Sequence, residues 1–365
     1  MKRVVILYGG KSGEHEVSLI SAASIVRHLD RGRYEPILVG IAKDGSWILQ
    51  DAGVLSEALA GEGPLPLRAG KAVLALASKG LAVLEEGGLL PLECDLVFPV
   101  LHGTFGEDGT VQGFLEVAGL PYVGAGVLGS ALGMDKEKSK ELWLRAGLPV
   151  VPYIAVRRSE LGSAAAIEGL ARRIEARFGW PCFVKPACSG SSVGSSKVDG
   201  PRGLGAALDE ALAWDEKAMV EPFVSAREIE CAVLGNASPR AFPPGEVIPS
   251  HEFYDYEAKY LDPQGARFEI PARLSAEQAE RVTTVAVAAF KACECSGMAR
   301  VDFFVDKRTG EVLLNELNTI PGFTHISMYP KMCESGGLAY AGLIERLLDL
   351  ALERHAAREA LRYSR

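Results

Sequence analysis

Residues 298 to 319 read MARVDFFVDKRTGEVLLNELNT and form the most informative stretch of the chain. Apolar residues at 301, 303 and 305 alternate with Arg300 and Asp302, and a polar turn near Thr309 leads into a second apolar run at 312 to 317. Two alternating runs separated by a short polar turn are typical of a β-hairpin. We therefore expect an antiparallel hairpin here.

The polar face of this hairpin predicts a metal site. A turn symmetric about residue 309 places Asp302 opposite Glu316, and Arg300 opposite Asn318. Directly opposed side chains lie about 4.5 to 5.5 Å apart at Cβ, so two facing carboxylates repel unless a cation lies between them. Oxygen ligands suit Mg²⁺ that bridges phosphates. A solvated strand face is the alternative, but two in-register polar pairs within an apolar hairpin favour metal.

A phosphate-binding loop is indicated at residues 183 to 194, FVKPACSGSSVG. Lys185 stands at a strand end before a Gly/Ser loop, and backbone N–H groups, hydroxyls and an ammonium together suit phosphate oxygens. A flexible linker is the alternative, which the preceding apolar strand residues disfavour. Two other glycine patterns fail as nucleotide motifs: residues 5 to 12 lack the first Walker A glycine, and residues 124 to 129 lack a ribose-binding acid at the expected distance.

Two further loops follow predicted strands of the first third. His102 begins HGTFGEDG after the apolar run 96 to 100, and Glu14 lies in GEHE after the run 3 to 8. Ligands of open α/β sheets bind at the carboxyl ends of strands, where both loops stand. A conformational turn and a surface charge cluster are the respective alternatives.

The length of 365 residues predicts two or three α/β domains with a site between them. Strands at 3–8, 34–41 and 96–100, with a helix at 18–29, indicate an open parallel sheet. Residues 50–93 show no clear periodicity and look peripheral. Further helices are expected at 135–146, 163–178 and 275–296, and further strands at 182–186 and 218–221. The expected domains are 1–128, 129–221 and 222–365, with a loop at 250–263 able to close over the site.

Bulk properties narrow the function classes. A net charge of −8 disfavours binding to nucleic acid. No apolar run approaches the roughly 18 residues of a membrane span, so we expect no membrane association. The N-terminus, MKRVVILYGG, is too short in apolar residues for a signal peptide, which favours a cytoplasmic protein. The seven cysteines lack the paired spacing of a zinc site and are expected to be free thiols.

Together these segments resemble the D-alanine:D-alanine ligase family of the ATP-grasp superfamily. The resemblance spans nearly the whole chain and is carried by GGKSGEHEVSLIS (9–21), HGTFGEDGTVQG (102–113), MDKEKSK (134–140), FVKPACSGSSVG (183–194), FYDYEAKY (253–260) and the block from MARVDFF to NELNTIPGFT (298–324). Several long motifs in the right order are specific. The implied fold is α/β: an ATP-grasp protein with three domains, an N-terminal open parallel sheet domain and an active site between the domains.

The resemblance implies a set of ATP contacts: Lys136 and Lys185 at the phosphates, Lys259 at the transferred phosphate, Glu221 and the backbone through Val224 at the adenine, and Glu228 at the ribose. It also implies that Asp302, Glu316 and Asn318 bind two Mg²⁺ ions, for which Mn²⁺ can substitute. This agrees with the independent argument from the hairpin. We also expect a homodimer.

For the amino-acid substrates, the resemblance implies that Glu14 receives the ammonium of the first D-alanine, positioned by Ser191 and Tyr260, and that Ser327 and the Met328 backbone receive the carboxylate of the second. His102 is expected among the substrate contacts. Arg300 and the Gly322 backbone N–H resemble an oxyanion hole. The implied reaction is ATP-dependent formation of D-alanyl-D-alanine through an acyl phosphate, for peptidoglycan precursor synthesis.

Three alternatives remain open at this point. A ligase that uses D-lactate as second substrate would give an ester, and a segment with Lys259 and Tyr260 favours the amide. A nucleotide-binding regulatory protein without turnover is disfavoured by the complete set of hairpin residues. An ATP-grasp ligase for a larger substrate, such as a peptide or purine, is disfavoured by the Glu14 motif.

Overall fold

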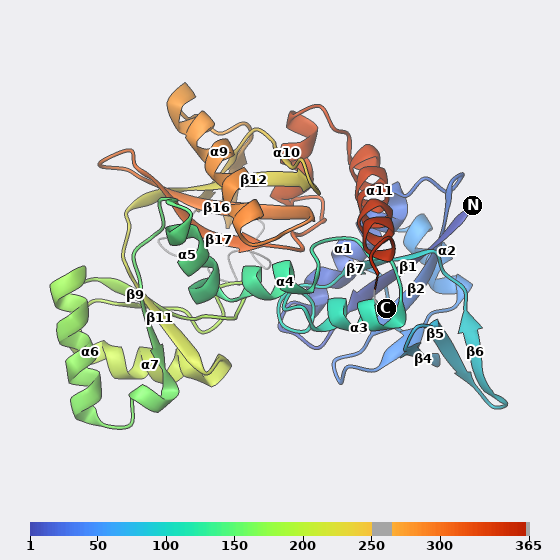
Figure 1. Ribbon diagram of the computed structural model, residues 1–365, viewed down its shortest axis with the longest axis horizontal. Helices are drawn as coiled ribbons and strands as arrows, with labels where there is room; N and C mark the ends of the chain where they lie inside the picture. The colour runs from blue at the N-terminus through green and yellow to red at the C-terminus, as the bar shows by residue number, and fades with distance from the viewer. Residues whose placement is uncertain (250–264, 363–365) are drawn as a thin grey trace.

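The computed structural model describes residues 1–249 and 265–362, and Figure 1 shows its β-sheets with helices packed around them. Three sheets follow one another along the chain, within residues 2–100, 154–222 and 226–318. The predicted domain boundaries after 128 and 221 remain proposals, and the second falls inside the last strand of the middle sheet. The predicted closing loop, with Lys259 and Tyr260, lies outside the described residues.

The N-terminal sheet has the spatial order β6-β5-β4-β3-β2-β1-β7. Its strands are β1 (Lys2–Gly9), β2 (Tyr34–Ile41), β3 (Trp47–Leu49), β4 (Lys71–Leu76), β5 (Gly80–Glu85), β6 (Gly88–Leu92) and β7 (Leu96–Val100). The helices of this part are α1 (His15–His28), α2 (Ala52–Ala60), α3 (Thr110–Ala118) and α4 (Val127–Met134).

Only part of this sheet is parallel. β1 pairs in parallel with β2 and β7, as the sequence predicted, and the continuous apolar runs of β1 and β7 are buried because both faces are covered. β3 to β6 extend the sheet with antiparallel pairs, so the whole sheet is mixed. These strands account for the segment 50–93 that showed no clear periodicity. Leu74, Leu89 and Leu90 are exposed there, which explains the weak pattern.

The middle sheet is antiparallel, with the order β10-β9-β11-β8. Its strands are β8 (Ile154–Arg157), β9 (Cys182–Pro186), β10 (Ser196–Val198) and β11 (Lys217–Pro222). The helices are α5 (Lys136–Arg145), α6 (Ala164–Arg177) and α7 (Leu204–Trp214), with 3-10 turns η1 (Arg158–Glu160) and η2 (Pro201–Gly203). Figure 1 shows α6 and α7 next to β9 and β11, and Ile174 and Leu208 of these helices share a core with Val184 and Val220.

The third sheet has the order β15-β14-β12-β16-β17, with β13 paired to β12. Its strands are β12 (Ala226–Gly235), β13 (Arg240–Ala241), β14 (Gly245–Pro249), β15 (Ala266–Glu269), β16 (Gly297–Asp306) and β17 (Val312–Asn318). The helices are α9 (Ala276–Ala292), α10 (Met328–Ser335) and α11 (Tyr340–Glu359). No described helix is long and apolar enough to cross a membrane.

One apolar core joins the first and third parts of the chain. Phe98 of β7 and Phe323, which follows β17, lie edge to face with ring centroids 6.1 Å apart. The stripe Leu343, Leu347 and Leu350 of α11 is buried in the same core, so this helix has a structural role. This packing fixes the loop after β17 against the carboxyl end of β7.

The hairpin β16–β17 has the predicted register at its functional end. Asp302 is opposite Glu316 and Arg300 is opposite Asn318. Beyond Asp302 the register shifts, so that Phe303 faces Leu314 and Asn315 is the extra residue of a bulge. The register predicted from a turn symmetric about residue 309 is therefore correct for both polar pairs. It is wrong for the half of the hairpin between Phe303 and the turn.

Candidate active site

The end of the hairpin gathers opposite charges in a partly buried position. Arg300 donates from Nε and Nη2 to the two carboxylate oxygens of Asp302, at 2.7 and 2.6 Å, and lies 3.2 Å from Glu230 on β12. Burial alone would lower the pKa of Arg300, but Asp302 and Glu230 raise it well above its ordinary value. The guanidinium is thus held rigidly as a cation, as an electrostatic catalyst requires.

Asp302, Glu316 and Asn318 offer oxygen donors on one face of the hairpin. The Asn318 amide lies 3.0 Å from Asp302, and Glu316 lies across from Asp302 on the neighbouring strand. Within residues 1–249 and 265–362, no cluster of three or more His, Cys, Asp or Glu side chains forms a metal cage. Two carboxylates and an amide fit Mg²⁺ that takes its remaining ligands from phosphate and water.

The predicted phosphate lysines stand beside this face. Lys136, at the start of α5, donates to the Ser189 carbonyl at 2.6 Å and lies 3.5 Å from Glu316. Lys185, at the end of β9, lies 2.7 Å from Glu221 and 3.4 Å from the Asn315 side chain. The bulge at Asn315 therefore turns an amide toward the second lysine.

The Gly/Ser loop reaches the N-terminal part of the chain. Ser191 and Ser192 have φ values of 49° and 58°, a left-handed conformation that is uncommon away from glycine and often found at functional sites. The Ser191 hydroxyl donates to the carboxylate of Glu14. A Cβ on Gly103 or Gly190 would come within 2.6 or 2.7 Å of Glu14, so both glycines make room for this carboxylate.

A second junction forms around the backbone of Ile320. The buried His102 ring donates from Nδ1 to the Ile320 carbonyl at 2.9 Å, and Glu107 accepts from the Ile320 N–H at 2.8 Å and from the Gly103 N–H at 3.0 Å. Burial lowers the pKa of His102 and raises the pKa of Glu107 to about 7, where Glu14 adds to the rise. His102 is therefore neutral, with its proton on Nδ1.

The remaining predicted residues occupy the edges of this region. Ser327 precedes α10 and accepts from the Thr324 N–H at 2.9 Å, while Met328 is buried in the first turn of the helix. A Cβ on Gly322 would come within 2.7 Å of the Ser327 hydroxyl, which brings that backbone close to the predicted carboxylate site. Val224 lies between β11 and β12, and Glu228 lies on β12.

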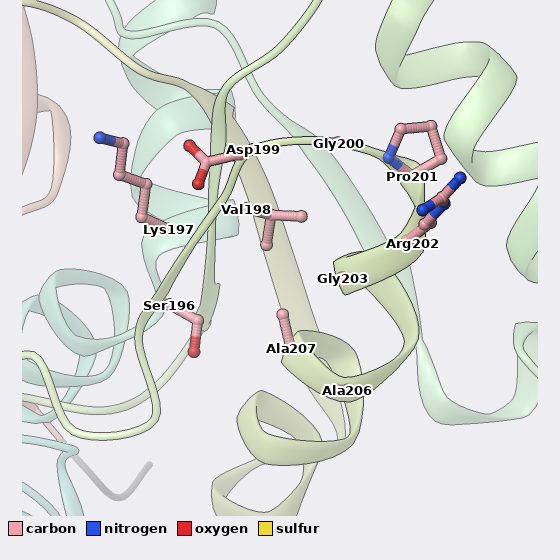
Figure 2. A pocket seen from close by; sticks show the side chains of 10 residues that line it. All are labelled: Ser196, Lys197, Val198, Asp199, Gly200, Pro201, Arg202, Gly203, Ala206 and Ala207. Carbon is pink, nitrogen blue, oxygen red and sulfur yellow. The ribbon is translucent and has the colours of Figure 1, made fainter.

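A separate pocket of about 690 Å³ lies on the middle part of the chain, between the loop after β10 and the start of α7. Figure 2 shows Lys197 at its rim pointing away from Pro201 and Arg202. The Lys197 ammonium lies 4.9 Å from the centre of the Phe223 ring, beside the β11–β12 connection. None of the predicted site residues lines this pocket, so it carries no assignment here.

Sequence reasoning singled out no role for Glu107, Lys140, Glu230 or Asn315. Glu107 and Lys140 both stand inside quoted motifs, HGTFGEDG and MDKEKSK. Their position within those motifs was the available signal. Asn315 likewise begins the quoted motif NELNTIPGFT, whereas Glu230 lies in no quoted motif and reaches the site through its strand pairing with Asp302.

The chain matches protein-family models and known proteins over most of its length. Models described as D-ala D-ala ligase N-terminus and C-terminus match residues 3–125 and 142–349. The chain is 51% identical over 364 residues to D-alanine–D-alanine ligase A of Bradyrhizobium diazoefficiens, covering 98% of this chain and 97% of the relative. It is 46% identical over 362 residues to the D-alanine–D-alanine ligase of Treponema denticola, covering 96% of each.

Two solved structures are also similar. The D-alanine-D-alanine ligase from Coxiella burnetii matches with a TM-score of 0.82 and 37% identity, covering 98% of this chain and 97% of that one. The VanG D-Ala:D-Ser ligase from Enterococcus faecalis matches with a TM-score of 0.83 and 35% identity, covering 96% and 99%.

Proposed function

Since the chain belongs to the D-alanine:D-alanine ligase family, we propose that it joins two D-alanine molecules to D-alanyl-D-alanine at the expense of ATP. The product is an amide that serves peptidoglycan precursor synthesis. The observation that carries this proposal is a continuous set of contacts: Ser191 of the Gly/Ser loop contacts Glu14, and Lys136 joins the same loop to Glu316 of the hairpin. Amino-acid, phosphate and metal sites are therefore adjacent.

The chemistry requires these groups in this order. A carboxylate is a poor electrophile, so the first D-alanine is phosphorylated by ATP to an acyl phosphate, with Glu14 holding its ammonium. The amine of the second D-alanine then attacks the acyl carbon, and inorganic phosphate leaves. Arg300 and the Gly322 N–H would stabilise the tetrahedral oxyanion, for which one donor in comparable sites contributes about 3 to 4 kcal/mol.

Phosphoryl transfer also needs charge neutralisation. Lys136 and Lys185 are placed for the ATP phosphates, and Lys259 would approach the transferred group. Glu221, the Val224 backbone and Glu228 would hold the nucleoside. Two Mg²⁺ ions, for which Mn²⁺ can substitute, would be held by Asp302, Glu316 and Asn318. The bound metal would neutralise part of the negative charge of the phosphates.

The identity of the second substrate is inferred from the residues proposed to bind it and from the names of the relatives. Ser327 and the Met328 backbone would receive its carboxylate, His102 would contact substrate, and Tyr260 would support Ser191 and Glu14. The two relatives at 46% and 51% identity carry the name D-alanine–D-alanine ligase, and the D-Ala:D-Ser ligase matches at 35% identity. We therefore assign D-alanine rather than D-serine or D-lactate.

The test is a competition at pH 7 with ATP and D-alanine, to which D-serine or D-lactate is added at equal concentration and then in excess. Phosphate release measures turnover, and mass analysis identifies the products. D-Alanyl-D-alanine should be the main product throughout. An ester or a D-alanyl-D-serine product at equal concentrations would overturn the assignment.

Three organisational proposals accompany this function. The domains comprise residues 1–128, 129–221 and 222–365. The protein is localised in the cytoplasm, and it assembles as a homodimer. Sedimentation of the purified chain tests the last point, since a dimer has twice the chain mass of 38.9 kDa.

A further inference from the structure

Lys140 is a buried charged residue to which the reaction described above gives no role. It lies on α5, and its side chain has no exposed surface. Its ammonium lies 2.8 Å from one carboxylate oxygen of Glu221, and 3.4 Å from the Val151 carbonyl. The ring of Tyr153 stands 5.9 Å from the same ammonium. A fully buried ammonium is unfavourable unless it is paired, so this contact is specific.

Glu221 lies between two lysines in this structure. One oxygen faces Lys140 at 2.8 Å, and the other faces Lys185 at 2.7 Å. Burial lowers the pKa of Lys140 to about 8, with Glu221 opposing the change. Burial also raises the pKa of Glu221, but the two ammonium groups together hold it below its ordinary value. The carboxylate is therefore ionised because of its lysine neighbours.

The two lysines differ in what they can reach. Lys185 lies at the end of β9 beside the Gly/Ser loop and next to Asn315, where the ATP phosphates are proposed to bind. Lys140 is enclosed between α5, β11 and the segment before β8, where its ammonium lies near Glu221, the Val151 carbonyl and the Tyr153 ring, none of which belongs to that loop. When Lys185 turns to phosphate, Lys140 is the lysine that stays with Glu221.

We infer that Lys140 is a positioning residue that holds the Glu221 carboxylate as a hydrogen-bond acceptor for the 6-amino group of adenine, and so sets the selectivity for the nucleotide base. This inference rests on the proposed role of Glu221 in the function above. A carboxylate only accepts hydrogen bonds, whereas a protonated carboxyl also donates one. The 6-oxo group of hypoxanthine is itself an acceptor, so an ionised Glu221 disfavours it.

Loss of Lys140 should therefore change selectivity in a defined direction. With Lys140→Met, the buried Glu221 has no fixed counter-ion once Lys185 faces phosphate, so it takes up a proton. It then donates to the 6-oxo group, and only its carbonyl oxygen remains as a good acceptor for the amino group. ATP binding weakens, and ITP binding weakens less or improves.

The experiment measures the dissociation constants of ATP and ITP by calorimetry, in the presence of Mg²⁺ and without D-alanine. We expect Lys140→Met to lower the preference for ATP over ITP at least about tenfold, or about 1.4 kcal/mol. Lys140→Arg, which keeps the charge, should retain most of the preference. Lys138→Met is the matched control, because Lys138 lies on the same helix, is half-buried and pairs with Glu141.

A second variant keeps the inference testable if Lys140→Met fails to fold. In Glu221→Gln, the Lys140 ammonium should hold the amide oxygen and turn the NH₂ group toward the base, which favours ITP. Equal weakening of ATP and ITP in Lys140→Met, or an unchanged ATP preference in Glu221→Gln, would overturn the inference. Because these measurements contain no D-alanine, they stay separate from the product test of the ligase reaction.

Discussion

Replacing Glu107 with glutamine should change how the stability of this protein depends on pH. Glu107 is buried, and its two oxygens accept from the Gly103 and Ile320 N–H groups at 3.0 and 2.8 Å. The contacts join the HGTFGEDG loop to the segment that follows β17 and carries Gly322. Burial, with a smaller effect of the Glu14 charge, raises the pKa of Glu107 from 4.5 to about 7.

The sign follows from proton binding. Between pH 4.5 and about 7 the folded protein holds a proton on Glu107 that the unfolded chain has lost, so the free energy of unfolding falls as the pH rises. This contribution to stability is fully present below pH 4.5 and is lost by about pH 7. At about 1.4 kcal/mol per pH unit, this interval corresponds to a loss of about 3 kcal/mol.

Glutamine has nearly the same shape and does not titrate. It also cannot accept from both backbone N–H groups, which costs about 1 to 3 kcal/mol at every pH and leaves the slope untouched. Urea unfolding of the parent and of Glu107→Gln at pH 5, 6, 7 and 8 gives the difference between their free energies. That difference should move by about 3 kcal/mol in favour of the variant as pH rises.

Titrating groups that do not interact with Glu107 cancel in this difference. Glu62→Gln is the control, since Glu62 is exposed and should show no such trend. A pH-independent difference between the parent and Glu107→Gln would refute the reasoning, because it would mean that Glu107 titrates alike in the folded and unfolded chain.

Three further predictions concern the metal face, the first substrate and the core. Glu316→Gln should lower turnover by at least about 100-fold because it removes a metal-ligand charge, whereas Glu311→Gln at the exposed hairpin turn should not; a loss below about tenfold in phosphate release would contradict the metal assignment. Ser191→Ala should raise the KM for D-alanine about tenfold, since its hydroxyl donates to Glu14, and an unchanged KM in steady-state kinetics would count against this. Phe290→Ala should lower the free energy of unfolding by about 3 to 5 kcal/mol, because Phe290 is fully buried on α9; urea titration would disprove the packing argument with a loss under about 1 kcal/mol.

The sequence predicted the hairpin well because two signals in it agree. The alternation of apolar residues set the faces, and the polar turn set the register, which is correct for Asp302 with Glu316. The bulge at Asn315 was missed because an extra residue in one strand leaves the alternation on either side readable. The resemblance to a family then supplied residue roles that no local pattern contains, and those roles remain proposals.

Other features depend on contacts between distant segments. Glu107 and Lys140 look like solvated charges in the sequence, since charged residues are usually exposed. In the folded chain they are buried, and distant segments that carry Ile320 and Glu221 lie against them. The antiparallel strands between residues 47 and 92 were not predicted from the sequence for a related reason. Their side chains are partly exposed at a sheet edge, so the sequence does not show a clear period-two alternation of apolar and polar residues.

The lysines of the proposed phosphate site face carboxylates. Lys136 lies 3.5 Å from Glu316, and Lys185 lies 2.7 Å from Glu221. Phosphate oxygens that bind both lysines would share the positive charge of the ammonium groups with these carboxylates. Glu316 would then face Asp302 across the hairpin with less compensating charge, a pairing that is unfavourable without a cation. Lys140 prevents the same imbalance at Glu221. Nucleotide and divalent metal should therefore bind interdependently at the hairpin, whereas the base site keeps its charge balance through the buried lysine.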